Sequence, residues 1–124
     1  NNRTVSMRVP TGPADTRHVE HRICGADANA YLAAAAVLAG TDYGIDREID
    51  PGAPVAGDGY QVTDAPALPV HWPMAIERFA QSPITKEYFS KRFVEIYSAV
   101  KRSESQRYLG EISNQDYDWY LQTV

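Results

Sequence analysis

The chain has 124 residues, of which 44% are hydrophobic and 23% are charged, and this composition is typical of a globular domain. The formal net charge of -4 argues against general nucleic-acid binding, which requires a basic surface to neutralise phosphates. The sequence has no apolar run long enough to cross a membrane, and its single cysteine cannot form an internal disulfide. We therefore expect a cytoplasmic protein with neither a nucleic-acid nor a membrane partner.

Two strands are predicted near the start of the chain. In residues 5–9 apolar and polar side chains alternate, which is typical of a half-buried strand. Turn-forming residues follow at 11–15, and a second alternation covers residues 17–23. The second strand places three side chains on one face: His18, Glu20 and Arg22. The two strands are expected to pair antiparallel.

Helices are predicted for most of the remaining chain. Asp27 is the expected N-cap of an alanine-rich helix over residues 28–39, which should end near Gly40 or Gly44. This helix has almost no polar face, which predicts that it is buried in a larger assembly. Residues 46–70 hold most of the prolines and several glycines, which indicates a long irregular connection.

Three more helices are predicted after the connection. A short helix should run from Pro73 towards Ala80, and a longer one should begin at Ser82-Pro83 and contain apolar residues at helical spacing up to Val100. Ser113 and Asp116 resemble a capping box that opens a final short helix. The predicted fold class is α+β, with a few antiparallel strands followed by several helices.

The first 22 residues concentrate side chains that suit anion binding. A guanidinium group binds phosphate or carboxylate oxygens with two donors at once, so several arginines around one site suit a polyphosphate. From composition alone a solvated strand face is the commoner explanation. A lone carboxylate cannot hold Mg2+, which needs further oxygen ligands. The cluster comprises Arg3, Arg8, Arg17, His18, Glu20, His21 and Arg22.

The histidines, the single cysteine and the aromatic residues indicate no second site. His18 and His21 have opposite parity, so they cannot both face one metal from a regular strand. Cys24 is expected to be a small buried residue, because no base partner stands out near it. The aromatic residues between 89 and 120 fit ordinary helix packing.

Residues 1–10, NNRTVSMRVP, and 17–40, RHVEHRICGADANAYLAAAAVLAG, resemble the C-terminal part of the catalytic domain of the glutamine synthetase superfamily. The shared features, in order, are an Asn-Arg-Ser/Thr strand, an Arg-Ile/Val-Pro strand end, a basic-x-Glu-x-Arg strand and an Asp-x-Ala-Asn-x-Tyr-Leu helix start. The resemblance implies that residues 1–124 are the C-terminal portion of such a domain. The N-terminal domain and the first part of the catalytic domain would then be absent.

The resemblance also implies roles for five side chains. Arg8 is similar to an arginine that contacts ATP phosphates, and Arg3 to one beside the transferring phosphoryl group and glutamate. Glu20 is similar to a ligand of Mg2+ or Mn2+. Arg22 is similar to an arginine that holds the substrate carboxylate or the developing phosphate, and His18 stands where relatives have a basic nucleotide-contacting residue.

The implied protein is a ligase in which ATP phosphorylates the side-chain carboxylate of glutamate and an amine then displaces the phosphate. Segments in the second half, such as LPVHWPMAIERFAQSP, resemble the glutamate-polyamine ligase branch, which includes γ-glutamylputrescine synthetases. A glutamine synthetase using ammonia, a non-catalytic interaction module and a distinct phosphate-binding protein are the alternatives. The resemblance further implies a homo-oligomeric ring for the intact protein and no activity for residues 1–124 alone, because Glu20 is a single metal ligand.

Overall fold

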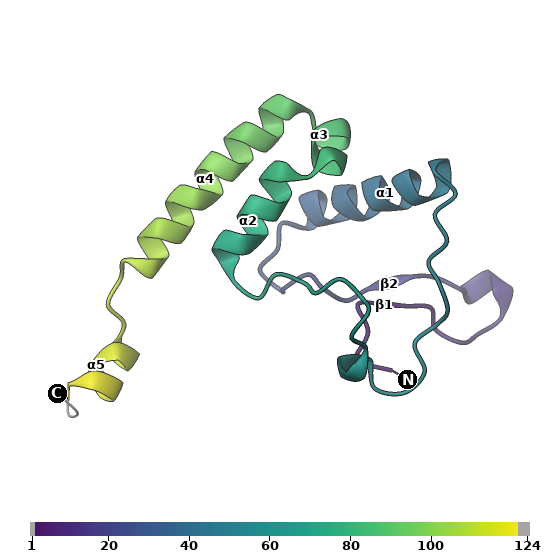
Figure 1. Cartoon of the computed structure of the whole chain (residues 1–124), viewed down its shortest axis with the longest axis horizontal. Helices are drawn as coiled ribbons and strands as arrows, with labels where there is room; N and C mark the ends of the chain where they lie inside the picture. The colour runs from purple at the N-terminus through teal and green to yellow at the C-terminus, as the bar shows by residue number, and fades with distance from the viewer. Residues whose placement is uncertain (1, 122–124) are drawn as a thin grey trace. The chain divides into compact units, whose positions relative to one another are not determined.

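The structure of the chain is a computed structural model that describes residues 2–121. Asn1, the first residue of the NNRTVSMRVP motif, and residues 122–124 lie outside the described part. The chain divides into two compact units, Asn1–Ala67 and Leu68–Val124. The secondary structure of the described part is a two-stranded antiparallel sheet, five α-helices and two short 3-10 helices (Figure 1). The predicted α+β fold class is confirmed.

The first unit begins with the predicted antiparallel strand pair. Strand β1 (Met7–Arg8) pairs with β2 (Glu20–His21), and Arg8 lies directly opposite Glu20. The backbone N–H of Arg22 donates to the carbonyl of Ser6 at 2.9 Å, which continues the ladder beyond the regular strands.

Both strands are shorter than the alternating patterns that predicted them. Between them lies the 3-10 helix η1 (Ala14–Thr16), where the backbone N–H of Thr16 donates to the carbonyl of Pro13 at 3.1 Å. Pro10 and Pro13 have no N–H to offer a neighbouring strand, so ladder hydrogen bonding stops near them.

Helix α1 (Ala30–Asp46) differs from its prediction at both ends. Its N-cap is Asn29 rather than Asp27, because the Asn29 side-chain oxygen accepts the backbone N–H groups of Tyr31 and Leu32, each at 3.1 Å. The helix also continues through both Gly40 and Gly44. An alanine-rich run of strong helix formers outweighs the cost of two glycines.

One face of α1 is apolar and exposed. Tyr31, Leu38 and Ile45 recur every seven residues and are 88%, 69% and 73% exposed. Ala39 is the buried apolar residue of this helix. The expectation that other parts of a larger assembly cover α1 stays a prediction.

The connection after α1 is irregular, as predicted, apart from the 3-10 helix η2 (Gly59–Gln61). The Asp58 side chain caps η2 by accepting the backbone N–H of Tyr60 at 3.0 Å. Residues 57–59 also form hydrogen bonds with residues 2–4 at the start of the chain.

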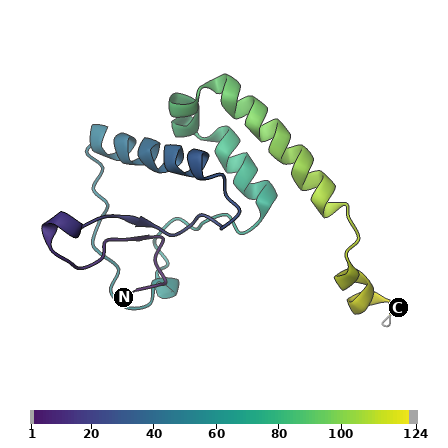
Figure 2. The ribbon, with the colours of Figure 1, turned by 180° about the vertical axis from the view of Figure 1, so that it is seen from behind.

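The second unit is helical. Its helices are α2 (Trp72–Gln81), α3 (Pro83–Phe89), α4 (Lys91–Leu109) and α5 (Asn114–Tyr120). Figure 2 shows α2 and α4 running alongside each other in opposite directions, with α3 at the turn between them.

The prediction of a single long helix from Ser82-Pro83 is wrong, because Ser90 interrupts the helix between α3 and α4. Ser90 has a φ of 65° and caps α4 by accepting the backbone N–H of Phe93 at 3.3 Å. The start at Ser82 is confirmed, since its side chain accepts the backbone N–H of Thr85. The apolar periodicity does continue across the break, and periodicity alone does not reveal a turn of one residue.

The core of the second unit lies between α2, α3 and α4. Ile76 and Val94 are 6% and 2% exposed. Four aromatic rings of these helices form a closed cluster: the centroids are 5.7 Å apart for Phe89–Phe93, 5.6 Å for Phe93–Tyr97, 5.3 Å for Phe79–Tyr97 and 6.3 Å for Phe79–Phe89. The predicted packing role is confirmed for Phe89, Phe93 and Tyr97, whereas the aromatic side chains of α5 (Tyr117, Trp119 and Tyr120) are 52%, 61% and 59% exposed.

Helix α5 begins with the predicted capping box. The Ser113 hydroxyl and backbone N–H both donate to the Asp116 carboxylate at 2.7 Å, and these bonds hold the pKa of Asp116 below its ordinary value. Separately, none of the helices within residues 2–121 has the length and apolar composition that crossing a bilayer requires.

Candidate functional site

The strand pair brings together two of the predicted site residues. The Arg8 Nη2 atom lies 2.8 Å from Glu20 Oε1 and 2.7 Å from Glu20 Oε2, so one nitrogen contacts both carboxylate oxygens. The two residues face each other across the strands, which is why the side chains meet. Both side chains are partly buried, at 25% and 31% exposed. The contact is therefore a cross-strand ion pair at the protein surface.

The surroundings of Glu20 keep its carboxylate ionised. The hydrogen bond from Arg8 is the largest influence and lowers the pKa of Glu20 below its ordinary value, against the opposing effect of partial burial. The positive charges of Arg8 and Arg22, and that of His18 when it is protonated, lower it further. The same hydrogen bond raises the pKa of Arg8. An ionised carboxylate can serve as a metal ligand, and the arginines around it can bind anionic oxygens.

The predicted shared face of the second strand is confirmed for two neighbours of Glu20. His18 Nε2 lies 3.9 Å from Glu20 Oε1, and the His18 side chain is 62% exposed. The Arg22 guanidinium donates from Nη1 to the backbone carbonyl of Asn2 at 3.1 Å, and its charge acts on the Glu20 carboxylate. The structure thus brings Arg8, His18 and Arg22 together near the Glu20 carboxylate.

Arg3 lies apart from this group. Its side chain is exposed and forms neither a hydrogen bond nor an ion pair with any residue between 2 and 121. Arg17 is exposed in the same way. The role implied for Arg3 stays a prediction.

Asn2 is a residue that the sequence analysis missed. Its backbone carbonyl, rather than its side chain, holds the Arg22 guanidinium. Every residue has a backbone carbonyl, so no residue type could have indicated this contact. The nearest sequence indication was the Asn-Arg-Thr order, which draws attention to Arg3 instead.

Cys24 differs from its prediction. The side chain is exposed rather than buried, because it follows the last ladder bond of the second strand and precedes a turn. Its Sγ atom lies 3.6 Å from His21 Nδ1, so a basic partner is present three residues away. This pair lies outside the Arg8–Glu20 ion pair.

Glu20 is the one carboxylate of this cluster that could serve as a metal ligand, and residues 2–121 hold no complete ligand set around it. Residues 2–121 contain no group of three or more His, Cys, Asp and Glu side chains placed to hold one ion. Mg2+ is commonly held by one or two carboxylates together with substrate phosphates and water. Glu20 fits as one such ligand, and the remaining ligands would have to come from elsewhere.

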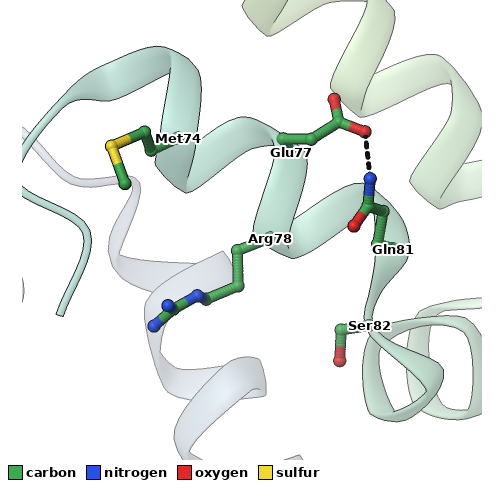
Figure 3. Close-up of a pocket in the computed structure, with 5 residues that line it drawn as sticks. All are labelled: Met74, Glu77, Arg78, Gln81 and Ser82. Atoms are coloured by element: carbon green, nitrogen blue, oxygen red, sulfur yellow. Dashed lines mark hydrogen bonds between the residues drawn. The ribbon is translucent and has the colours of Figure 1, made fainter. Parts of the chain in front are cut away.

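The second unit has an open hollow on α2 that is a weaker candidate. Met74, Glu77, Arg78, Gln81 and Ser82 line it, and Figure 3 shows Glu77 and Gln81 joined by a hydrogen bond of 2.7 Å. Glu77 also pairs with Arg102 of α4 at 2.9 Å. Glu77, the only carboxylate among the five residues that line the hollow, therefore joins α2 to α4, which is a structural role.

The site and the fold agree with a known family. A family model described as the catalytic domain of glutamine synthetase matches residues 1–120. The chain therefore belongs to the glutamine synthetase catalytic-domain family, and this confirms the resemblance found in the sequence.

Three relatives show how similar the chain is to individual ligases of this family. The gamma-glutamylputrescine synthetase of Escherichia coli is 34% identical over 124 residues, which cover 100% of this chain and 26% of the relative. The glutamate–isopropylamine ligase of a Pseudomonas species is 34% identical over 125 residues, covering 99% of this chain and 27% of the relative. The glutamine synthetase of Rhizobium meliloti is 31% identical over 128 residues, covering 100% and 28%. The chain thus spans about a quarter of the length of these relatives.

Proposed function

We propose that residues 1–124 are the C-terminal part of the catalytic domain of an ATP-dependent ligase that joins glutamate to an amine. The observation that carries this proposal is the Arg8–Glu20 ion pair with Arg22 beside it, found in a chain of the glutamine synthetase family. An interaction module would have no need of an ionised carboxylate held among cationic side chains on one strand face. A distinct phosphate-binding protein would need the arginines but not the carboxylate.

Each side chain has a separate task in this proposal. Arg8 binds phosphate oxygens of ATP, and Arg22 holds the carboxylate of the glutamate substrate, since guanidinium groups match both kinds of anion. His18 contacts the nucleotide from the exposed rim of the site, and Arg3 reaches the transferring phosphoryl group. Such phosphoryl transfer relies on positioning and charge stabilisation, which arginines supply.

Glu20 is the proposed ligand for Mg2+ or Mn2+. A divalent cation bound there together with ligands from elsewhere in the protein would neutralise the phosphate charge that develops during transfer. Because Glu20 is a single ligand, we expect no ligase activity from residues 1–124 alone. Phosphate release by the purified chain with ATP, Mg2+, glutamate and amine would contradict this expectation.

The proposed amine is a polyamine such as putrescine. Two relatives at 34% identity are named for organic amines, putrescine in one and isopropylamine in the other. Glutamine synthetases match this chain at 28% to 32% identity, so ammonia is the second candidate. We further propose that the intact ligase is a ring-shaped homo-oligomer and works in the cytoplasm, where ATP is supplied.

The role of the site can be tested in the intact ligase with single substitutions. Arg8→Ala and Arg22→Ala should each lower kcat/KM about 10- to 100-fold, because each removes hydrogen bonds to a charged group. Glu20→Gln should raise the Mg2+ concentration needed for half-maximal rate. Arg17→Ala is the matched control, since Arg17 is an exposed arginine of the same segment that forms no hydrogen bond or ion pair with residues 2–121, and it should leave these constants unchanged. Wild-type kinetics in all the site variants would refute the proposed site.

The amine is tested by measuring phosphate release with ATP, Mg2+ and glutamate while one amine is added at a time. We expect putrescine or a related polyamine to give a higher kcat/KM than ammonium or a monoamine. Preference for ammonium would identify a glutamine synthetase and would leave the ligase assignment intact.

A further inference from the structure

The loop at 57–61 is hydrogen-bonded to the residues that precede β1, although it is far from them in sequence. The side-chain amide of Asn2 donates to the carbonyl of Gly57 at 2.8 Å. The backbone N–H of Gly59 donates to the Thr4 hydroxyl oxygen at 2.6 Å. Fifty-five residues separate the partners in each of these bonds, so they join the loop at 57–61 to the start of the strand pair.

The Thr4 hydroxyl is the junction of this network. It accepts the hydrogen bond from Gly59 and donates its own proton to the Asn2 side-chain oxygen at 2.6 Å. The same Asn2 oxygen accepts the backbone N–H of Thr4 at 2.9 Å. The Asn2 side chain is therefore held at both of its polar atoms, by Thr4 on one side and Gly57 on the other.

The network ends at the guanidinium of Arg22. The Asn2 backbone carbonyl accepts the bond from Arg22 Nη1 at 3.1 Å, while the side chain of the same residue is held by Thr4 and Gly57. This bond uses one of the five donors of Arg22 and leaves the others for a ligand. A loosened Asn2 would allow the guanidinium to move away from the edge of Glu20.

Gly59 allows the loop to come this close. A Cβ atom added at Gly59 would clash with the backbone carbonyl and the hydroxyl of Thr4. Any larger residue at position 59 must therefore push the loop away from Thr4, which breaks the bond between the Gly59 N–H and the Thr4 hydroxyl.

We infer that Thr4, acting through Asn2, is a positioning residue for Arg22, and that the loop at 57–61 sets the affinity for glutamate by holding Thr4 and Asn2 in place. The inference rests on the proposed function, because Arg22 is taken to bind the glutamate carboxylate. Neither Thr4 nor Gly59 touches a substrate in this account. Their effect should appear in the KM for glutamate and not in the KM for ATP.

The experiment compares substitutions at Thr4 in the intact ligase. Thr4→Val keeps the size of the side chain but removes the hydroxyl, and it should raise the glutamate KM roughly fivefold, the effect of one neutral hydrogen bond. Thr4→Ser keeps the hydroxyl and should retain the wild-type KM. Thr63→Val is the matched control, because Thr63 is exposed and forms no hydrogen bond with the described residues.

A double substitution separates positioning from general destabilisation. In an Arg22→Ala background, Thr4→Val should cause no further rise in the glutamate KM, since the group that Thr4 positions has gone. Gly59→Ala should reproduce the effect of Thr4→Val in the wild-type background. If Arg22→Ala raises the glutamate KM while Thr4→Val and Gly59→Ala do not, or if their effects add fully to that of Arg22→Ala, the positioning role is wrong. If Arg22→Ala itself has no effect, the proposed function fails instead.

Discussion

At the scale of single residues, the ion pair between Arg8 and Glu20 is the central contact of the candidate site, because it keeps the Glu20 carboxylate ionised. Part of this site could be predicted from the sequence, because a period of two residues places Glu20 and Arg22 on one strand face. The partnership with Arg8 could not be predicted, since it depends on which residues of the two strands lie opposite each other. That register is fixed by η1 and the prolines around it, and alternation alone does not define it.

The lowered pKa of Glu20 predicts how stability depends on pH. A carboxylate whose pKa is lower in the folded state stabilises the fold above its ordinary pKa of 4.5, and this stabilisation is lost as pH falls through the lower folded value. Urea unfolding at a series of pH values should show wild type more stable than Glu20→Gln at neutral pH. The difference should disappear in acid. A constant difference at every pH would show that the ion pair with Arg8 does not cause it.

At the scale of elements, the sequence predicted which segments are helical better than it predicted where they end. The capping box at Ser113 and the cap at Ser82 were found because side-chain caps have residue-type patterns. The extension of α1 through its glycines was missed, because each glycine costs a helix only about 1 kcal/mol relative to alanine, which the strong helix formers before Gly40 can outweigh. The break at Ser90 was missed because it depends on a backbone angle.

Ser90 offers a test of that break. Its φ of 65° and ψ of 148° lie in a region that is essentially restricted to glycine and costs other residues about 1–3 kcal/mol. Ser90→Gly should therefore stabilise residues 1–124 by about 1 kcal/mol, since glycine is only slightly poorer than serine as an N-cap.

The matched variant is Ser90→Ala, which keeps the unfavourable angle and loses the cap, and it should destabilise by about 1 kcal/mol. Urea unfolding followed by circular dichroism measures both changes. A loss of stability in Ser90→Gly would mean that the cap matters more than the backbone angle.

Gly40 gives a second prediction at this scale. It lies inside α1, and a Cβ atom added there meets no other atom within 4 Å. Gly40→Ala should stabilise residues 1–124 by about 0.5–1 kcal/mol, because alanine loses less backbone entropy in a helix. Gly52→Ala is the contrasting variant, since Gly52 has a φ of +78° that alanine adopts poorly, and it should destabilise. Thermal unfolding of both variants should give shifts of opposite sign.

At the scale of the whole molecule, each unit exposes large apolar side chains that a self-sufficient domain would bury. Leu38 and Ile45 lie on the exposed face of α1, and Leu109 and Trp119 are 67% and 61% exposed in the second unit. The relatives are about four times as long as the chain, so they have further residues that could cover such surfaces. The sequence predicted this for α1, whose lack of a polar face was visible in its composition.

We expect these surfaces to affect the isolated chain. Residues 1–124 should bind a fluorescent apolar dye in their native state and unfold in urea with an m-value below that of a compact domain of the same length, because less surface is buried. Arg17→Ala, which changes no apolar surface, should leave both properties unchanged. Negligible dye binding together with a full m-value would show that the chain folds as an independent domain.

The ion pair between Arg8 and Glu20 also has a thermodynamic consequence for the proposed ligase. Each partner neutralises the other, so a cation that takes both carboxylate oxygens of Glu20 displaces Arg8 Nη2, and an anion that takes Nη2 releases these oxygens. The first ligand bears the cost of breaking the pair, and the second finds its own partner already released. Cation and nucleotide should therefore bind with positive cooperativity, and linkage requires that each raises the affinity for the other by the same factor.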